Sequence, residues 1–414
     1  MKIALVARHA SPPTHAIDPY SADQAAHVNG LGRALAAQGH DVVIYARKDR
    51  ADLPGSRLIA PGLRAEFITA GPLAPVPADQ LPQYASDIAR HLAARWRVSR
   101  PDVVHAFHWT SGLAALAAAR EVPVPVISTF GSLGAAERRA GLADECSPAR
   151  QRMESCVARA ATSVLATTSG EVAELARMGL PNAQVACVPT GVDVEAFRPD
   201  GYVAKRKKQV RLITIGSLAP DRRLDLLLRC LAELPGAELM IVGGPAADDL
   251  ESDRGYRILA KLAAHLGITE RVQFTGHVSD QALPRLLKSA DLLVSVARYE
   301  PQAGIAIRAM ACGIPVVATA IGSYADAVID GTCGLLIPAE RPAALARKLR
   351  ELLASPMRLS AFGVAAADRA RSRYPWERIA AETTVVYEKA VAKTPPVTPL
   401  KVVRAASQPA GIAA

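Results

Sequence analysis

The chain has 414 residues, more than one hydrophobic core usually holds, so we expect two domains. Half of the residues are hydrophobic and only 4% are aromatic, which favours helices packed on sheets and argues against an all-β protein. The formal net charge of +10 favours anionic partners, such as nucleotide phosphates or an anionic membrane surface, but the Lys and Arg residues are scattered, so nucleic-acid binding is not expected.

The first 194 residues alternate between strand and helix patterns. Residues 3–7 are typical of a buried strand, residues 25–38 of a helix with Val28, Leu31 and Leu35 on one face, and residues 42–46 of the next strand. Further strands are expected at residues 103–105, 126–129, 163–167 and 185–188. This order predicts a parallel sheet covered by helices, so we assign residues 1–194 to a first, Rossmann-like domain.

A polar stretch at residues 195–209, with a basic run from Lys205 to Lys208, predicts a solvated linker. A second alternating series follows over residues 210–375, with strands expected at residues 211–215, 238–242, 272–274, 292–296, 315–319 and 335–337. The fold class is therefore α/β, with two Rossmann-like domains whose parallel sheets face a cleft. That cleft is the default ligand site, because such sheets bind ligands outside the carboxyl ends of their strands.

The N-terminal residues and the cysteines indicate where in the cell the protein is expected. Residues 3–7 are too short for a signal-peptide core, and no run of ~18 apolar residues occurs. The six cysteines include no C-x-x-C pair, so neither a zinc site nor a disulfide framework is expected. We therefore expect a cytoplasmic protein, for which peripheral contact with the membrane's inner face stays open. Residues 393–414, rich in Pro and Ala, predict a flexible tail.

The most informative stretch is ARYEPQAGIAIRAMACGIP, residues 297–315, which follows a strand and opens a helix. Glu300 precedes the small residues Ala303 and Gly304, and such residues leave backbone N–H groups at a helix N-terminus accessible to an anionic diphosphate. In that setting the Glu300 carboxylate would accept hydrogen bonds from sugar hydroxyls. The plainer alternative is an ordinary turn in which Glu300 is only a favourable charge near a helix N-terminus.

The same stretch resembles the nucleotide-sugar signature of glycosyltransferase family 4, E-x7-E followed by A-M-A-x-G-x-P-V-V-A. The resemblance continues in order through PDVVHAFHWTSG, TFGSLGAAERR, VPTGVDVEAFRP, IGSLAPDRRLDLLL and AIGSYADAVIDGTCGLLIP. Residues 376–392 resemble the family's C-terminal helix, which crosses back onto the first domain. The chain is most similar to the bacterial branch with the mycothiol-pathway glycosyltransferase and sucrose-phosphate synthase-like enzymes.

The resemblance implies a GT-B fold and transfer of a hexose from a UDP- or GDP-linked donor, with retention of configuration and without a metal or other cofactor. This chemistry needs a pocket that neutralises the leaving diphosphate and stabilises an oxocarbenium-like sugar. No D-x-D motif stands in a suitable loop. The acceptor is not readable, because acceptor loops vary most in this architecture.

On the donor side, the resemblance gives Glu300 a catalytic contact with the sugar and places Arg222, with Arg223 beside it, at the family's phosphate-binding lysine. Two donor positions depart from the family pattern. The family's phosphate-binding arginine falls on Ser217, and the second carboxylate of E-x7-E, which holds the ribose, falls on Arg308, whose guanidinium can only donate hydrogen bonds. The backbone expected against the diphosphate belongs to Gln302, Ala303, Gly304 and Ile305.

On the acceptor side, His105 and Trp109 match the family's HAHxW pattern. The histidine expected between them falls on Phe107, and His108 follows it. We take His105 and His108 as catalytic candidates, although histidines near a strand end are as typical of packing. Three further positions depart from the family: its glycine pair falls on Ala22 and Asp23, where a carboxylate would repel a phosphate, and the histidine after T-F falls on Gly131.

Two interpretations remain open. In the first, the chain is an active transferase with an altered donor pose. In the second, it is a catalytically degenerate relative that binds a nucleotide sugar or a protein partner. Elsewhere, we expect Glu154 and Glu171 on solvated helix faces, and Trp109 and Trp376 in the core or at a domain interface.

Overall fold

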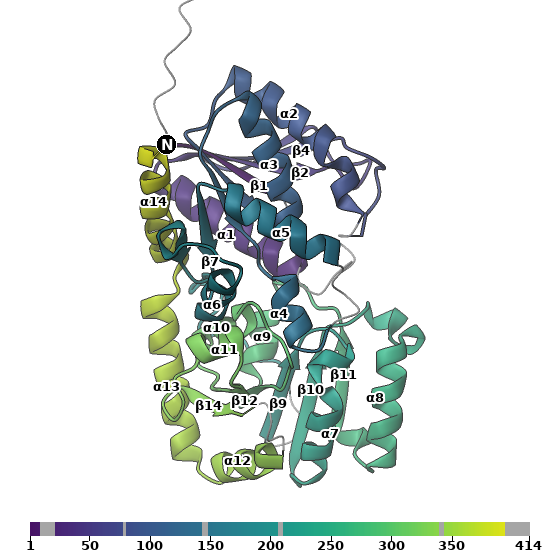
Figure 1. Ribbon diagram of the computed structural model, residues 1–414. Helices are drawn as coiled ribbons and strands as arrows, with labels where there is room; N and C mark the ends of the chain where they lie inside the picture. Colours follow the sequence, from purple (N-terminus) through teal and green to yellow (C-terminus); the bar gives the residue numbers. More distant parts are fainter. Residues whose placement is uncertain (9–20, 78–79, 143–147, 206–209, 339–342, 394–414) are drawn as a thin grey trace, which may run out of the picture.

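The computed structural model describes residues 1–8, 21–77, 80–142, 148–205, 210–338 and 343–393. These residues form two α/β domains, one above the other in Figure 1, each built on its own sheet. The predicted fold class is therefore confirmed. Residues 206–208 of the basic run and residues 394–414 of the expected tail lie outside the described residues.

The first domain has an eight-stranded sheet in the order β3-β4-β2-β1-β5-β6-β7-β8. Its pairings are parallel, except that β3 runs antiparallel to β4. The strands are β1 (Lys2–Ala7), β2 (Asp41–Arg47), β3 (Ser56–Ala60), β4 (Leu63–Ile68), β5 (Val103–Phe107), β6 (Val126–Thr129), β7 (Ser163–Ala166) and β8 (Val185–Cys187).

Helices cover both faces of this sheet. The predicted apolar face of the first helix is buried, with Val28, Leu31 and Leu35 in the core beside the strands β1 and β2. The helices are α1 (Ser21–Ala37), α2 (Ala85–Val98), α3 (Trp109–Glu121), α4 (Gly134–Arg139), α5 (Pro148–Ala160) and α6 (Ser169–Arg177).

The second domain has a six-stranded parallel sheet in the order β11-β10-β9-β12-β13-β14. Its strands are β9 (Val210–Ile215), β10 (Ala237–Val242), β11 (Val272–Gly276), β12 (Leu292–Ser295), β13 (Val316–Thr319) and β14 (Gly334–Ile337). Its helices are α7 (Leu224–Ala232), α8 (Arg254–His265), α9 (Leu283–Lys288), α10 (Gly304–Ala311), α11 (Gly322–Ala327), α12 (Ala343–Leu353) and α13 (Pro356–Arg373).

The strand order reverses once in each sheet. In the first domain β1 pairs with both β2 and β5, and in the second domain β9 pairs with both β10 and β12. Ligands of doubly wound sheets bind at such reversals, outside the carboxyl ends of the strands. The loops that follow β1, β5, β9 and β12 are therefore the ones to examine for a site.

The last helix, α14 (Trp376–Lys393), packs on the first domain although it follows the second in sequence (Figure 1). Its Tyr387 is fully buried in the core of the first domain. At its start, Trp376 is wedged between Gly30 of α1 and Gly191, where an added Cβ would approach the indole ring to 2.2 Å and 2.5 Å respectively. Through this packing, α14 connects the end of the second domain to the first domain.

Candidate active site

Glu300 lies in the loop between β12 and α10, at the strand-order reversal of the second domain, and it is 7% exposed. Its Oε2 accepts a hydrogen bond from Arg222 Nη1 and, at 3.3 Å, one from the Tyr324 hydroxyl. Its backbone carbonyl accepts from Ser323 Oγ at 2.9 Å. Gly322 must lack a side chain here, because a Cβ would come within 2.8 Å of that same carbonyl oxygen.

Arg222 comes from the loop between β9 and α7, on the neighbouring strand of the reversal. Burial raises the pKa of the Glu300 carboxyl, the charge of Arg222 opposes that increase, and the Asp23 carboxylate adds to it. Arg223, the next residue, has a left-handed backbone with φ 52° and stands at the start of α7. The loop therefore gives the two arginines different positions, and the one that contacts Glu300 is Arg222.

Ser217 lies in the same loop as Arg222, two residues past the end of β9. Its Oγ is buried and has no hydrogen-bond partner among the described residues. Gly216, just before it, lies against Arg222, whose guanidinium carbon is 3.4 Å from the position of an added Cβ. This part of the loop is thus packed under the Arg222 guanidinium.

The backbone from Gln302 to Ile305 begins α10, whose first residue is Gly304. Ala303 is buried, and Gly304 faces the first domain, with Asp23 Oδ1 3.7 Å from the position of its missing Cβ. Gln302 also reaches across the cleft, because its Nε2 is 3.1 Å from where a Cβ on Gly131 would lie. The N-terminus of α10 therefore meets two of the first-domain positions that depart from the family pattern.

Arg308 lies one turn further along α10. Its Nη1 is 3.7 Å from Asp280 Oδ1 and 4.0 Å from Asp23 Oδ1, and its guanidinium carbon lies 5.6 Å from the centre of the Phe197 ring. Burial raises the pKa of the Asp23 carboxyl against the attraction of Arg308 and Arg222. The charge reversal at Arg308 is thus accompanied by a carboxylate on the facing domain.

His105 is fully buried and both of its ring nitrogens have partners. Thr129 Oγ1 donates to the carbonyl of Leu165 at 2.7 Å, so it accepts from His105 Nε2, and Nδ1 therefore accepts from the Tyr387 hydroxyl at 2.8 Å. Burial holds the pKa of His105 well below its usual value. His105 thus connects α14 to the sheet, and its burial and its two engaged ring nitrogens argue against the catalytic role expected from the sequence.

His108 directly follows β5 and has φ 77°, a backbone conformation that is strained for a residue with a side chain. Its Nδ1 lies 2.9 Å from Thr110 Oγ1 and accepts from the Thr110 N–H, so the side chain caps α3. Phe107 points into the core beside His27, with ring centres 5.6 Å apart, and Trp109 is 5% exposed. Of these residues, His108 alone combines backbone strain with a position at the carboxyl end of a strand.

The remaining first-domain candidates differ in how they are placed. Gly131 follows β6 and has φ 75°, which favours glycine. Asp23 lies in the first turn of α1 at the cleft, whereas the side chain of Ala22 lies outside the described part of the structure. His27 is a buried residue that was not among the expected site residues. Its Nδ1 lies 3.0 Å from Thr190 Oγ1, and burial lowers its pKa to about 4.

The loop after β6 is fixed by a buried ionic cluster that the sequence did not predict. Arg150 donates to both oxygens of Glu137 at 2.8 Å and 3.0 Å, to Glu154 at 2.7 Å and to Ser132 at 3.1 Å. Glu154 also accepts from the Gly134 N–H at 2.9 Å. The expectation of a solvated Glu154 is wrong, since it is 1% exposed and sets the path of the loop that carries Gly131.

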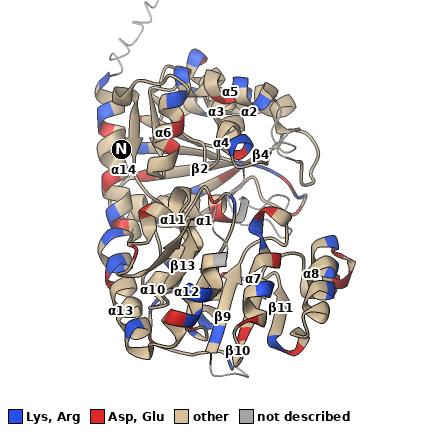
Figure 2. Ribbon diagram, turned by 60° about the horizontal axis from the view of Figure 1, so that its bottom comes forward, with Lys and Arg blue, Asp and Glu red and all other residues tan. Residues whose placement is uncertain are grey.

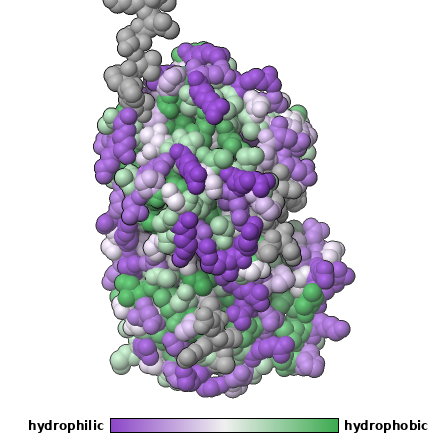
Figure 3. Space-filling view, viewed as in Figure 1, coloured by the Kyte–Doolittle hydropathy of each residue, from purple (hydrophilic) through white to green (hydrophobic). Residues whose placement is uncertain are grey.

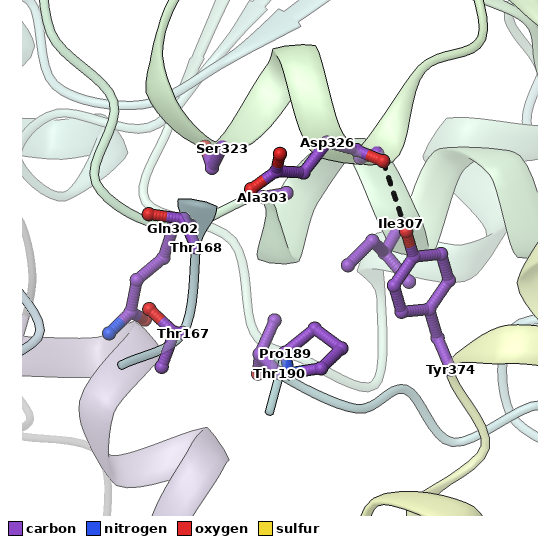
Figure 4. A pocket seen from close by; sticks show the side chains of 11 residues that line it. Thr167, Thr168, Pro189, Thr190, Gln302, Ala303, Ile307, Ser323, Asp326 and Tyr374 are labelled. Atoms are coloured by element: carbon purple, nitrogen blue, oxygen red, sulfur yellow. Dashed lines mark hydrogen bonds between the residues drawn. The ribbon is translucent and has the colours of Figure 1, made fainter. Parts of the chain in front are cut away.

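A pocket lies between the domains (Figure 4). Thr167, Thr168 and Thr190 line it from the first domain, and Gln302 and Asp326 from the second. Figure 4 shows the Gln302 side chain beside Thr167, on the side of the cavity away from Tyr374. Near it, Asp326 accepts from the backbone N–H of Ser169 at 2.7 Å and from its hydroxyl, so the domains are hydrogen-bonded here.

A second cavity lies in the first domain at the carboxyl ends of β1 and β2. Arg8, Arg47, Thr110 and Ser111 are among its lining residues. Arg47 donates to backbone carbonyls of the loop after β4, including that of Pro72 at 2.6 Å, so its charge is engaged locally. Arg8 is 8% exposed, and its Nε donates to Gln24 at 3.4 Å.

The described residues contain no group of three or more His, Cys, Asp or Glu side chains that could hold a metal ion. Among them, no helix is both long and apolar enough to span a membrane. Lys and Arg alternate with Asp and Glu over both domains in Figure 2. Figure 3, in the view of Figure 1, shows hydrophilic residues across the middle of the molecule, where the two domains meet.

Both halves of the chain match known glycosyltransferase families. Residues 24–196 match the family described as Glycosyltransferase Family 4, and residues 201–369 match the one described as Glycosyl transferases group 1. The boundary between the two matches falls at the crossover between the two sheets.

Similar proteins cover nearly the whole chain. A D-inositol 3-phosphate glycosyltransferase 2 from Catenulispora acidiphila is 32% identical, over 94% of this chain and 95% of its own length. A D-inositol 3-phosphate glycosyltransferase from Streptomyces scabiei is also 32% identical, over 94% of this chain and 91% of its own length.

Among solved structures, the sucrose-phosphate synthase of Thermosynechococcus elongatus superposes with a TM-score of 0.85 at 25% identity, over 95% of this chain and 99% of that one. The Anabaena protein HepE, solved in complex with UDP and glucose, superposes with a TM-score of 0.72 at 18% identity, over 94% of this chain and 99% of that one.

Proposed function

Because this chain belongs to the glycosyltransferases of family 4, we propose that it transfers a hexose from a nucleotide-sugar donor to an acceptor hydroxyl, with retention of configuration and without a metal ion. The observation that carries the proposal is the buried Arg222–Glu300 pair beside the N-terminus of α10, at the strand-order reversal of the second sheet. It combines a cation for a diphosphate with a carboxylate for sugar hydroxyls.

In this proposal the diphosphate binds between Arg222 and the backbone of residues 302–305. The dipole of α10 and the guanidinium both favour negative charge there, and that charge grows on the leaving group as the sugar bond breaks. Glu300 accepts hydrogen bonds from the sugar, and Arg222 and Tyr324 fix its orientation. UDP is the preferred nucleotide, since a protein of the same fold is described as bound to UDP.

The proposed acceptor site is the first-domain cavity lined by Arg8, Thr110 and Ser111. Hydroxyl side chains at the start of α3 and a largely buried guanidinium suit an acceptor that carries an anionic group. The similar inositol 3-phosphate transferases carry a phosphorylated polyol in their names, which supports an acceptor of that class.

A second candidate function is binding without transfer. It is favoured by one observation, the side chain of Gln302, which lies within 3.1 Å of the space that a side chain at position 131 would need, on the loop where the family has a histidine. A transferase that relied on that histidine would be inactive here, whereas a binding module would not need it.

The test is a transfer assay that pairs UDP- and GDP-linked hexoses with inositol phosphates and hexose phosphates, with products detected by mass spectrometry and their anomeric configuration by NMR. We expect a glycosylated product of retained configuration with a UDP-linked donor. Donor binding without product from any pair would establish the binding module instead.

A further inference from the structure

Two of the positions that depart from the family pattern lie against each other across the cleft. Asp23 belongs to the first turn of α1 in the first domain, and Arg308 to α10 in the second. Arg308 Nη1 is 4.0 Å from Asp23 Oδ1, which makes an ion pair between the domains. In the sequence they are two separate departures from the family pattern, whereas in the fold they form one ion pair.

The Asp23 carboxylate also lies at the N-terminus of α10. Its Oδ1 is 3.7 Å from the position of a Cβ on Gly304, the first residue of that helix. Burial raises the pKa of the Asp23 carboxyl, and the charges of Arg308 and Arg222 partly oppose that increase. A helix N-terminus with guanidinium groups nearby favours an anionic phosphate, and here a carboxylate of the chain itself lies beside it.

We propose that Asp23 competes internally with the donor diphosphate: it occupies the anion site formed by the N-terminus of α10, Arg222 and Arg308, and it leaves when the nucleotide binds. This inference rests on the proposed function, because it concerns the same site. A diphosphate and a carboxylate cannot share the site, because like charges ~4 Å apart repel each other strongly in a partly buried setting.

Displacement has two consequences. When the nucleotide binds, Arg308 gives up its contact with Asp23 of the first domain and contacts the nucleotide instead. The guanidinium then serves as a second cation for the phosphates, which offsets the loss of the family's ribose-binding carboxylate. The domains also lose one of the contacts that join them. The measured affinity of the unmodified protein for any diphosphate is therefore its intrinsic affinity multiplied by the fraction of molecules in which Asp23 has left the site.

The test compares Asp23→Asn, which keeps the shape and removes the charge, with the unmodified chain in calorimetric titrations with UDP and with inorganic pyrophosphate. We expect Asp23→Asn to bind both ligands at least ~10-fold more tightly. The matched control is Asp280→Asn. Asp280 lies 3.7 Å from the same Arg308 nitrogen but belongs to the second domain, so its loss should change affinity by less than about threefold.

Equal gains in the two variants would show a general charge effect and overturn the proposal, as would unchanged or weaker binding in Asp23→Asn. If Asp23→Asn gains affinity for pyrophosphate while neither protein binds UDP, the competition stands and the proposed donor is wrong. If both proteins bind UDP equally well, the donor assignment stands and the competition is wrong. Should Asp23→Asn fold poorly, Asp23→Ser provides the same comparison.

Discussion

Glu300 and Arg222 are each almost buried, and each is the main charged partner of the other. Burial of an ion pair is tolerated when hydrogen bonds orient it, and Tyr324 supplies a further one here. That both residues bind the donor stays a prediction from the sequence, and their contact with each other could not be predicted, because it depends on how the loops after β9 and β12 meet. A pair held this firmly is already oriented before a substrate arrives.

Exchange of Glu300 for Gln should lower turnover at least ~10-fold, which corresponds to ~1.4 kcal/mol of lost transition-state stabilisation. The amide keeps the size of the side chain but replaces one accepting oxygen by a donor, which faces the Arg222 guanidinium unfavourably. Steady-state kinetics measure the effect, with exposed Glu270→Gln as the matched control. Unaltered turnover in Glu300→Gln would remove Glu300 from the site.

Arg222→Ala should weaken UDP binding and reduce its dependence on salt, since the guanidinium lies beside the proposed diphosphate site. Arg223→Ala serves as the control, because Arg223 stands at the start of α7 whereas Arg222 donates a hydrogen bond to Glu300. Titrations at two ionic strengths distinguish them. A larger effect of Arg223→Ala would mean that our alignment of this loop with the family is off by one residue.

The histidines show where residue-level reasoning reaches its limit. Strand alternation places His105 and Phe107 on one face of β5, and the sequence cannot say that this face meets α14 and the core instead of the cleft. The same holds for Glu154, whose helix was expected to be solvated and whose carboxylate is buried against Arg150. Long-range packing decided each case.

At the scale of elements, strands with apolar runs were predictable, and the hairpin of β3 and β4 was not. The core strands have continuous apolar runs, as in β1 and β10. The edge strand β3 is exposed over its first three residues, and in β4, which is mostly buried, Arg64 and Glu66 interrupt the apolar residues. The family resemblance, rather than any local pattern, indicated that the C-terminal helix returns to the first domain.

The packing of Trp376, at the start of α14, against Gly191 leads to a prediction about stability. Gly191→Ala would bring a methyl group within 2.5 Å of Trp376 and should destabilise the protein by about 1–3 kcal/mol through overpacking. Gly55→Ala is the matched control, because a Cβ there meets nothing within 4 Å. Denaturant unfolding compares the two variants, and equal stabilities would show that Trp376 can move without cost.

At the scale of the whole molecule, the proposed site exists only because two sheets face each other. Glu300 and Arg222 come from the second domain, while Asp23 and Gly131 meet the start of α10 from the first. The two-domain α/β architecture was predictable from the alternation of elements, whereas the hairpin of β3 and β4 at the edge of the first sheet was not. The pairing of Asp23 with Arg308 was not, because no local pattern connects residues so far apart in the chain.

The central claim is that a nucleotide-sugar donor binds at the Arg222–Glu300 pair. The measurement that tests it most directly is the melting temperature of the unmodified chain and of Arg222→Ala with UDP, GDP and ADP, since a ligand at about 100 times its Kd adds ~2.7 kcal/mol to the stability of the folded state. We predict that UDP raises the melting temperature of the unmodified chain and has no such effect on Arg222→Ala. Equal shifts in both proteins, or no shift with any of the three nucleotides, would contradict the account.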